Sequence, residues 1–168
     1  MSGWIEVKGM RNKVLPILTI LTVLIIWGHS LLPGGVSSEE SGRVLELLLP
    51  FWNGLGLGKF LPLDEHIVRK AFGHFLEYTV LGLELGGLAV LSFRGMSGKS
   101  NAGDRFLSAG KSVVQLALTG FLVAFLDESI QMISPDRGPA IADVWLDFGG
   151  VVSGMTVVLL LRRIHIIR

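Results

Sequence analysis

The residues best suited to chemistry are ionisable side chains that lie within or beside very apolar stretches of the chain. They form three groups with helical spacing, namely Lys70, His74, Glu77 and Tyr78, then Asp127, Glu128 and Gln131, and then Asp143 and Asp147. Residues three or four apart share a face of a helix, so each group could present its side chains together. A histidine among carboxylates could act as a general acid or base, or bind a metal, because imidazole titrates near neutral pH.

Four carboxylates form the densest of these groups, and two interpretations of them stay open. The four are Asp127, Glu128, Asp143 and Asp147. Carboxylates this close cannot all stay ionised unless a proton or a cation lies among them. That cation could be a divalent metal held by carboxylate oxygens and His74. Alternatively, Lys70, Arg69 and Arg137 could pair with the acids in a salt-bridge network, and no HExxH-type metal motif decides between the two.

Arg137 and the pair of His74 and Glu77 also allow two interpretations each. Arg137 lies in "SPDRGPA", whose Ser-Pro and Gly-Pro steps predict a turn. A guanidinium there could bind a phosphate or carboxylate in bidentate fashion, or simply pair with Asp136 or Asp127. His74 and Glu77 could be a base and its orienting carboxylate, or a hydrogen bond that fixes two helices.

The composition indicates what kind of protein must position these groups. Half of the residues are hydrophobic, only 17% are charged and the mean hydropathy is +0.60. About a quarter of the residues of a typical soluble domain are charged, so the chain is expected to be a membrane protein. A net charge of +1 gives no reason to expect a nucleic-acid partner, and the absence of cysteine excludes disulfides, thiol nucleophiles and thiolate metal sites.

Four segments are long and apolar enough to cross a bilayer, which takes about 20 residues. They cover about residues 14–32, 67–93, 106–133 and 141–161. A soluble four-helix bundle would need a polar stripe along each helix, and the first and last segments have none. We therefore predict an all-α, polytopic membrane protein in which residues 1–168 form one domain.

The connection over residues 33–66 predicts a further helix at the outer membrane surface. Ser37 or Ser38 could cap its start, and acidic residues follow in the first turn. Charged residues recur along one face and Val44, Leu47, Leu48 and Phe51 along another, as in an interfacial amphipathic helix. We expect Pro50 and the glycines after it to end this helix.

The distribution of lysine and arginine predicts the orientation in the membrane. The larger set comprises Lys8, Arg11, Lys13, Arg94, Lys99, Arg105, Lys111, Arg162, Arg163 and Arg168, and the smaller set comprises Arg43, Lys59, Arg69, Lys70 and Arg137. Basic residues favour the cytoplasmic side, so both termini are expected to be cytoplasmic. At 1.5 Å per residue, His74, Asp127 and Asp147 then each lie roughly 9 Å inside the outer end of a span.

Taken together, these residues make the sequence resemble the VanZ-like family of small bacterial membrane proteins. The matching residues are Lys70, His74, Phe75, Tyr78, Asp127, Glu128, Gln131, Arg137, Asp143, Asp147, Gly150 and Gly154, with "WGHSLLPG" at the end of the first span. The resemblance runs from Trp27 to Gly154. It implies a multi-pass protein of the bacterial cytoplasmic membrane, contact with membrane lipids, and an association with the cell envelope and teicoplanin resistance. The family usually has asparagine at the position of Asp147, so a role that needs a neutral amide there is not carried over.

Three functions fit these residues. The first is an enzyme that transfers or hydrolyses a group on a lipid-linked or cell-wall substrate. Its predicted catalytic residues are His74, Asp127, Glu128 and Asp143, and its predicted substrate-binding residues are Lys70, Glu77, Tyr78, Gln131, Arg137 and Asp147. The second is a non-catalytic protein that binds a lipid, a lipid-linked precursor or a glycopeptide in the same pocket. The third, ranked last, is a small transporter or proton relay, for which only Glu84 extends towards the cytoplasmic side.

Overall fold

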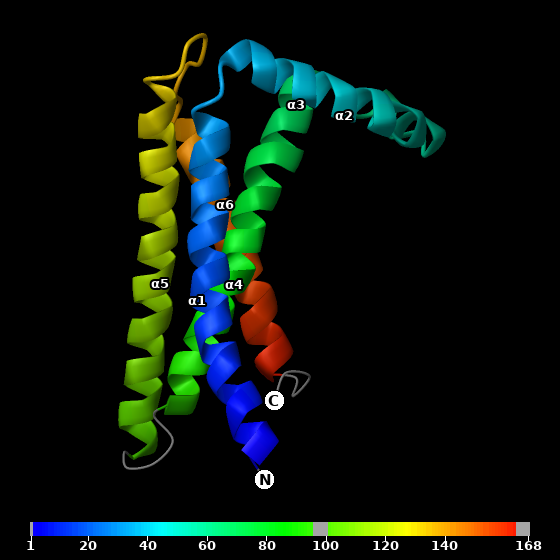
Figure 1. The fold of residues 1–168 in the computed structure, drawn as a ribbon. Helices are drawn as coiled ribbons and strands as arrows, with labels where there is room; N and C mark the ends of the chain where they lie inside the picture. Colours follow the sequence, from blue (N-terminus) through cyan, green and yellow to red (C-terminus); the bar gives the residue numbers. More distant parts are fainter. Residues whose placement is uncertain (1, 96–100, 164–168) are drawn as a thin grey trace.

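The computed structural model describes residues 2–95 and 101–163 as helices joined by short connections (Figure 1). In chain order the elements are α1 (Ser2–Ser30), α2 (Gly34–Gly54), the 3-10 turn η1 (Leu57–Lys59), α3 (Glu65–Val68), the π-helix η2 (Arg69–Phe75), α4 (Leu76–Gly95), α5 (Ala102–Gln131) and α6 (Ile141–Arg163). No strand occurs among these residues. Lys99 and Arg168, on which the predicted orientation partly depends, lie outside them.

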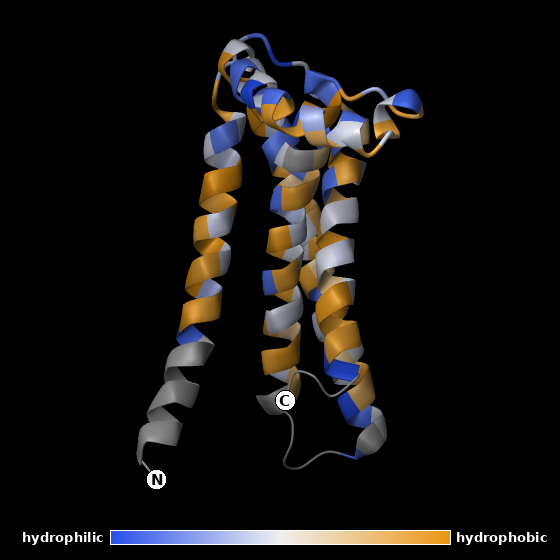
Figure 2. Cartoon of the chain, turned by 90° about the vertical axis from the view of Figure 1, so that its right-hand side faces the viewer, coloured by the Kyte–Doolittle hydropathy of each residue, from blue (hydrophilic) through white to orange (hydrophobic). Residues whose placement is uncertain are grey.

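Four helical stretches are long and apolar enough to cross a membrane, which confirms the predicted all-α polytopic fold. They are Lys13–Ser30, Glu65–Phe93, Gly103–Gln131 and Ile141–Arg163. Their outward surfaces carry leucine, isoleucine and valine, and Ile20, Leu24 and Leu118 are each more than half exposed. Figure 2 shows the same apolar colouring along the length of the helices, with hydrophilic residues gathered at their ends. Such a surface suits contact with lipid tails.

The helices α1, α4, α5 and α6 lie alongside one another as a bundle, and the two ends of this bundle differ (Figure 1). α1 begins and α6 ends at one end of the bundle. At the other end lie α2, α3 and the turn between α5 and α6, and we call it the α2 end. α4 is the central helix, since it packs against α1, α5 and α6, and most extensively against α6.

Four glycines bring the backbones of α4 and α6 into contact, and we call them the glycine seam. They are Gly82 and Gly86 on α4, and Gly150 and Gly154 on α6. A Cβ at Gly154 would overlap the carbonyl oxygen of Thr79, and one at Gly82 would overlap the backbone of Val151. Small residues four apart allow such close approach in membranes, as the spacing of Gly150 and Gly154 predicts.

The second span is not one regular α-helix, which the sequence did not lead us to expect. Asp64 caps its start by accepting a hydrogen bond from the Ile67 N–H at 2.8 Å, and α3 then passes into the π-helix η2. π-Helical hydrogen bonds join residues five apart and are frequent near functional sites. The segment matters here because Arg69, Lys70 and His74 all lie on η2.

The helix α2 exists as predicted and ends at one of the predicted glycines, Gly54, but its predicted start and the predicted stop at Pro50 are wrong. It begins at Gly34, where the N–H donates to Pro135 O at 3.0 Å, rather than at a Ser37 or Ser38 cap. A side chain at Gly34 would overlap the backbone of Asp136, so glycine lets the helix start against the α5–α6 turn. Pro50 lies inside the helix, which continues to Gly54 despite the backbone hydrogen bond that proline cannot donate.

α2 extends sideways from the bundle and exposes a large apolar surface (Figure 1). Leu47, Phe51 and Leu55 are each more than 70% exposed, and Phe60 just after the helix is 88% exposed. Glu39 and Arg43 lie on a different face, where they pair at 2.6 Å. This distribution matches a helix that lies in the membrane interface.

Candidate functional site

Polar side chains from α1, η2, α4, α5 and α6 meet at the α2 end of the bundle, and we call them the polar layer. Its buried members are Ser30, Asp127, Glu128, Gln131, Ser134 and Asp147, and its partly buried members include Lys70, His74, Glu77, Arg137 and Asp143. Four helices that are distant in sequence thus deliver polar groups to one level.

Three ion pairs cross between helices in this layer. They join Lys70 Nζ to Asp143 Oδ1 at 2.5 Å, His29 Nδ1 to Glu77 Oε1 at 2.7 Å, and His74 Nδ1 to Asp147 Oδ1 at 3.6 Å. The first and third connect η2 to α6, and the second connects α1 to α4. The pair of His29 and Glu77 replaces the predicted pair of His74 and Glu77.

Two carboxylates of the layer are enclosed without adequate partners. Asp127 and Asp147 are both 0% exposed. Neither oxygen of Asp147 has a hydrogen-bond partner in the described part of the chain, and neither does Oδ1 of Asp127. The other oxygen, Oδ2 of Asp127, accepts a long hydrogen bond of 3.4 Å from Gln131 Nε2. Burying a carboxylate without partners is costly, so this arrangement requires a specific explanation.

The remaining predicted acid, Glu128, has a structural partner. Its Oε2 accepts the Ala140 N–H at 3.0 Å, just before α6 begins at Ile141. Gln131 Nε2 also donates to Ser30 Oγ at 3.4 Å, and Ser134 Oγ donates to the Ser30 carbonyl at 2.7 Å. These contacts fasten α5 and the α5–α6 turn to the end of α1.

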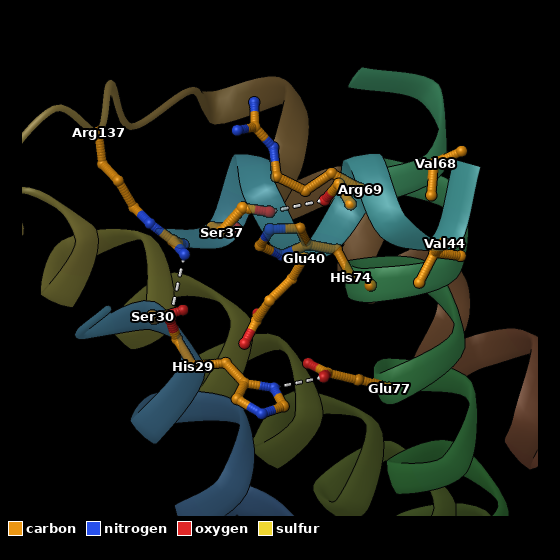
Figure 3. Close-up of a pocket in the computed structure, with 12 residues that line it drawn as sticks. His29, Ser30, Ser37, Glu40, Val44, Val68, Arg69, His74, Glu77 and Arg137 are labelled. Carbon is orange, nitrogen blue, oxygen red and sulfur yellow. Dashed lines mark hydrogen bonds and ion pairs between the residues drawn. The ribbon is translucent and has the colours of Figure 1, made fainter. Parts of the chain in front are cut away.

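A cavity of about 190 Å³ opens beside the layer, beneath α2 (Figure 3). Its lining comes from α1, α2, α3, η2, α4 and the α5–α6 turn, and consists of His29, Ser30, Ser37, Glu40, Ser41, Val44, Val68, Arg69, Gly73, His74, Glu77 and Arg137. A second cavity of about 70 Å³ lies next to it. Arg69, His74 and Arg137 line both, so they form the wall between them.

Two arginines thus line the same two cavities as His74, although Arg69 Nη2 also lies 3.3 Å from His66 Nδ1. Arg137 Nη2 donates to the His29 carbonyl at 3.1 Å, which leaves its other donors available. Burial lowers the pKa of Arg137, and the like charge of Arg69 lowers it further. Two cations held this close favour an anion between or beside them.

The structure brings most of the predicted site residues to this region, though not to one surface. His74, Glu77 and Arg137 line the larger cavity, and Lys70, His74, Gln131, Arg137 and Asp143 line the smaller one. Asp127, Asp147 and Tyr78 are fully buried in the bundle, and the Tyr78 hydroxyl has no partner among the described residues.

Nine of the twelve residues that line the larger cavity were absent from the predicted site, among them Arg69, His29 and Ser30. A signal existed for these three, because Arg69 adjoins Lys70 and the other two end the first span in the same layer. Glu84, by contrast, lies outside the layer and accepts a hydrogen bond from Thr22 Oγ1 at 2.9 Å, which joins α4 to α1.

The chain was compared with family models, curated proteins and solved structures. A family model described as VanZ/LLP1 matches residues 15–162. That range includes all but the outermost one or two residues of the four membrane-spanning stretches, together with α2 and every residue of the polar layer. No curated protein and no solved structure matches the chain.

Proposed function

The chain belongs to the VanZ/LLP1 family, and from that premise we propose that it is a bacterial envelope protein that acts on an anionic, lipid-linked substrate. The phosphate or carboxylate group of the substrate would enter the larger cavity beneath α2. By the association that the family resemblance implies, the cellular outcome would be tolerance of glycopeptides such as teicoplanin. The observation that carries this proposal is the convergence of Arg69, Arg137 and His74 on one cavity.

The two guanidinium groups supply the binding half of the proposal. Guanidinium groups recognise phosphate and carboxylate through parallel N–H donors, with geometry that lysine does not offer. Loss of a hydrogen bond to a charged group costs about 1.5–3 kcal/mol, which corresponds to about 10- to 150-fold in affinity. The exposed apolar face of α2 borders the site, so the acyl chain of a lipid substrate could remain in the membrane.

His74 supplies the chemical half. It lies against the cavity wall with Nδ1 directed at Asp147, at 3.6 Å. A carboxylate behind an imidazole orients the ring and stabilises its protonated form, as in many acid–base pairs. In this proposal His74 transfers the proton during group transfer or hydrolysis, and Asp147 is a positioning residue. The non-catalytic alternative uses the same cavity and differs only in the absence of turnover.

The proposal also needs the cavity to face away from the cytoplasm. The described basic residues at the end opposite α2 are Lys13, Arg105, Lys111, Arg162 and Arg163. Basic residues favour the cytoplasmic side, which supports cytoplasmic termini in the bacterial inner membrane. A proton relay to that side gains no support from Glu84, because this carboxylate bonds Thr22.

The test compares variants in a teicoplanin-susceptible bacterium that expresses the protein. We expect His74→Ala and the double variant Arg69→Gln/Arg137→Gln to abolish the gain in minimum inhibitory concentration. Arg43→Gln is the matched control, because Arg43 is an exposed arginine whose partner is Glu39 on the same helix. Equal protection by all variants at equal membrane abundance would refute the proposal.

A second measurement separates an enzyme from a binding protein. Native mass spectrometry of the purified protein would compare adducts of phosphatidic acid, a phosphomonoester lipid, with those of phosphatidylcholine. The double arginine variant should lose the preference for phosphatidic acid. An enzyme should keep this preference in His74→Gln while losing protection in cells. A binding protein should keep both.

A further inference from the structure

Three ligand-type atoms meet at the centre of the polar layer. They belong to His74, Asp127 and Asp147, one imidazole nitrogen and two carboxylate oxygens that all lie within 4.8 Å of one another. The residues come from η2, α5 and α6, so the cluster exists only in the folded bundle. No single segment of the chain carries a metal motif, and the juxtaposition appears only with the tertiary structure.

The two aspartates are fully buried and have too few hydrogen-bond donors around their oxygens. Both side chains are 0% exposed, and three of their four oxygens have no hydrogen-bond partner in the described residues. Each oxygen has lone pairs that water or a protein donor would normally occupy. Oxygens buried in this way point to a proton or a cation as the missing partner.

Two basic side chains of the layer contact groups other than these aspartates. Lys70 pairs with Asp143 at 2.5 Å, and Arg137 donates to the His29 carbonyl at 3.1 Å. Glu128 binds the Ala140 N–H at 3.0 Å, which separates it from the cluster. Glu128 Oε1 is also without a hydrogen-bond partner among the described residues, but of the four acids only Asp127 and Asp147 belong to the described group of ligand atoms within 4.8 Å that includes His74.

We propose that His74, Asp127 and Asp147 bind one divalent first-row transition-metal ion, of which Zn²⁺ is the best representative. Zinc takes imidazole nitrogen and carboxylate oxygen ligands at about 2.0–2.2 Å. Two such ligands of a tetrahedral ion are about 3.4 Å apart, so atoms within 4.8 Å need only small side-chain movements. A mixed nitrogen and oxygen set suits zinc or manganese better than magnesium or calcium, which prefer oxygen alone.

The ion would have a route in and an open coordination position. His74 lines both cavities, whereas the two aspartates lie behind it and are fully buried. Sites with three protein ligands keep a position for water or substrate, and here that position would face the cavity of Arg69 and Arg137. The alternative occupant is a proton shared between the two carboxylates.

Metal binding by the purified full-length protein tests the inference. The protein is stripped with a chelator, dialysed against Zn²⁺, Mn²⁺, Mg²⁺ or Ca²⁺ separately, and analysed by inductively coupled plasma mass spectrometry. We expect about one Zn²⁺ per chain. We also expect more than about tenfold weaker binding in Asp147→Asn and in His74→Gln, since loss even of an outer-shell partner weakens binding about 10- to 100-fold. Cobalt substitution should give visible bands of a tetrahedral nitrogen and oxygen site.

Glu84→Gln is the control. Glu84 is a carboxylate of the same membrane span as His74, but it lies outside the cluster and accepts a hydrogen bond from Thr22. It should bind Zn²⁺ as the wild type does. The isosteric Asp147→Asn and His74→Gln keep the test valid if an alanine variant does not fold, and size-exclusion chromatography checks their folding. Three results would overturn the inference: no stoichiometric Zn²⁺ in the wild type, equal affinity in every variant, or binding of Mg²⁺ or Ca²⁺ in preference to Zn²⁺.

This inference stands on the cluster and not on the proposed function. Metal content is measured without any substrate, lipid or antibiotic. If the protein binds Zn²⁺ but gives no protection against teicoplanin, the proposed function is refuted and the metal site is supported. If it gives protection but binds no metal, the metal site is refuted, the proposed function is kept, and a proton shared between the two carboxylates is favoured.

Discussion

The second span, which includes η2 and α4, meets α6 in two different ways along its length. Near the α2 end, η2 and α6 are joined by the side chains of Lys70 with Asp143 and His74 with Asp147. Further along, α4 and α6 meet through the glycine seam, where backbone lies against backbone. Residues four apart build both contacts on the α4 side, in the sequence Lys70, His74, Tyr78, Gly82 and Gly86. One face of the second span thus carries ionisable residues near the α2 end and glycines farther from it.

The difference separates stability from function. In the seam, close packing is favourable in itself, because apolar helices in lipid associate through van der Waals contact. In the polar layer, buried carboxylates lack partners and cost stability. Costs of this kind persist in proteins mostly where a site needs the group. We therefore expect substitutions in the seam to unfold the protein, and substitutions in the polar layer to change what it binds.

The largest effect should come from Gly154→Leu in the seam. The new side chain would overlap the carbonyl oxygen of Thr79 and the backbone of Leu83 and Gly82, which cannot move without separating the helices. Overpacking against side chains costs about 1–3 kcal/mol, and a backbone obstacle should cost more than that. Thermal unfolding and size-exclusion chromatography in detergent would detect the loss of the folded monomer.

Gly110→Leu is the matched control for this prediction. Gly110 is a glycine of α5 with no atom within 4 Å of a built Cβ. Its replacement should leave the unfolding temperature unchanged or slightly raised, because leucine favours helix more than glycine does. If Gly154→Leu behaves like Gly110→Leu, α4 and α6 do not depend on the seam.

The seam is also the part of the molecule that the sequence predicts best. Apolar runs of about 20 residues are visible without a structure, and so is the spacing of Gly150 and Gly154. Both signals depend only on neighbours along one helix. The structure confirms the four-span helical fold on this basis.

The polar layer was predictable only in part, for a physical reason. Spacing along one helix places Lys70 and His74 on one face, but the partner of each is decided by contacts between helices. The sequence thus suggested His74 with Glu77, whereas the structure pairs Glu77 with His29 and His74 with Asp147. The π-helix and the start of α2 at Gly34 depend on contacts of the same long-range kind.

An intermediate effect on stability should come from replacing an aspartate of α6 with asparagine. The effect should have opposite signs at Asp147 and Asp143. In metal-free protein, Asp147→Asn should raise stability by about 1–2 kcal/mol, because it removes a buried charge whose oxygens have no hydrogen-bond partner among the described residues and whose ion pair with His74 is long, at 3.6 Å. Asp143→Asn should lower stability, because it leaves Lys70 without its carboxylate. The two residues lie one turn apart, and the chemical change is the same.

Thermal unfolding in a chelating buffer measures both variants. For a domain of this size, about 1–2 kcal/mol corresponds to a shift of about 2–8 °C in Tm. Added Zn²⁺ should then raise the Tm of the wild type and not that of Asp147→Asn, since a ligand stabilises the state that binds it. Destabilisation of both variants alike would mean that Asp147 holds the helices together, and the contrast between layer and seam would fail.

The smallest effect on stability should come from α2, which belongs to neither region. Phe51 is 77% exposed and the Glu39 side chain is 66% exposed, so changes at either residue should alter stability by less than about 0.5 kcal/mol. Their environments should nevertheless differ, because an interfacial helix buries its apolar face about 5–10 Å into the lipid boundary. The chain has no cysteine, so Phe51→Cys and Glu39→Cys can each carry a single spin label.

In vesicles, a label at position 51 should be relaxed by oxygen dissolved in the lipid, and a label at position 39 by a nickel chelate in water. Equal access of the chelate to both would show that α2 stands clear of the membrane. The cavity beneath it would then open to water alone, and a substrate with a lipid anchor would have no route to Arg69 and Arg137. The orientation of one amphipathic helix therefore decides whether the polar layer serves a lipid or a soluble anion.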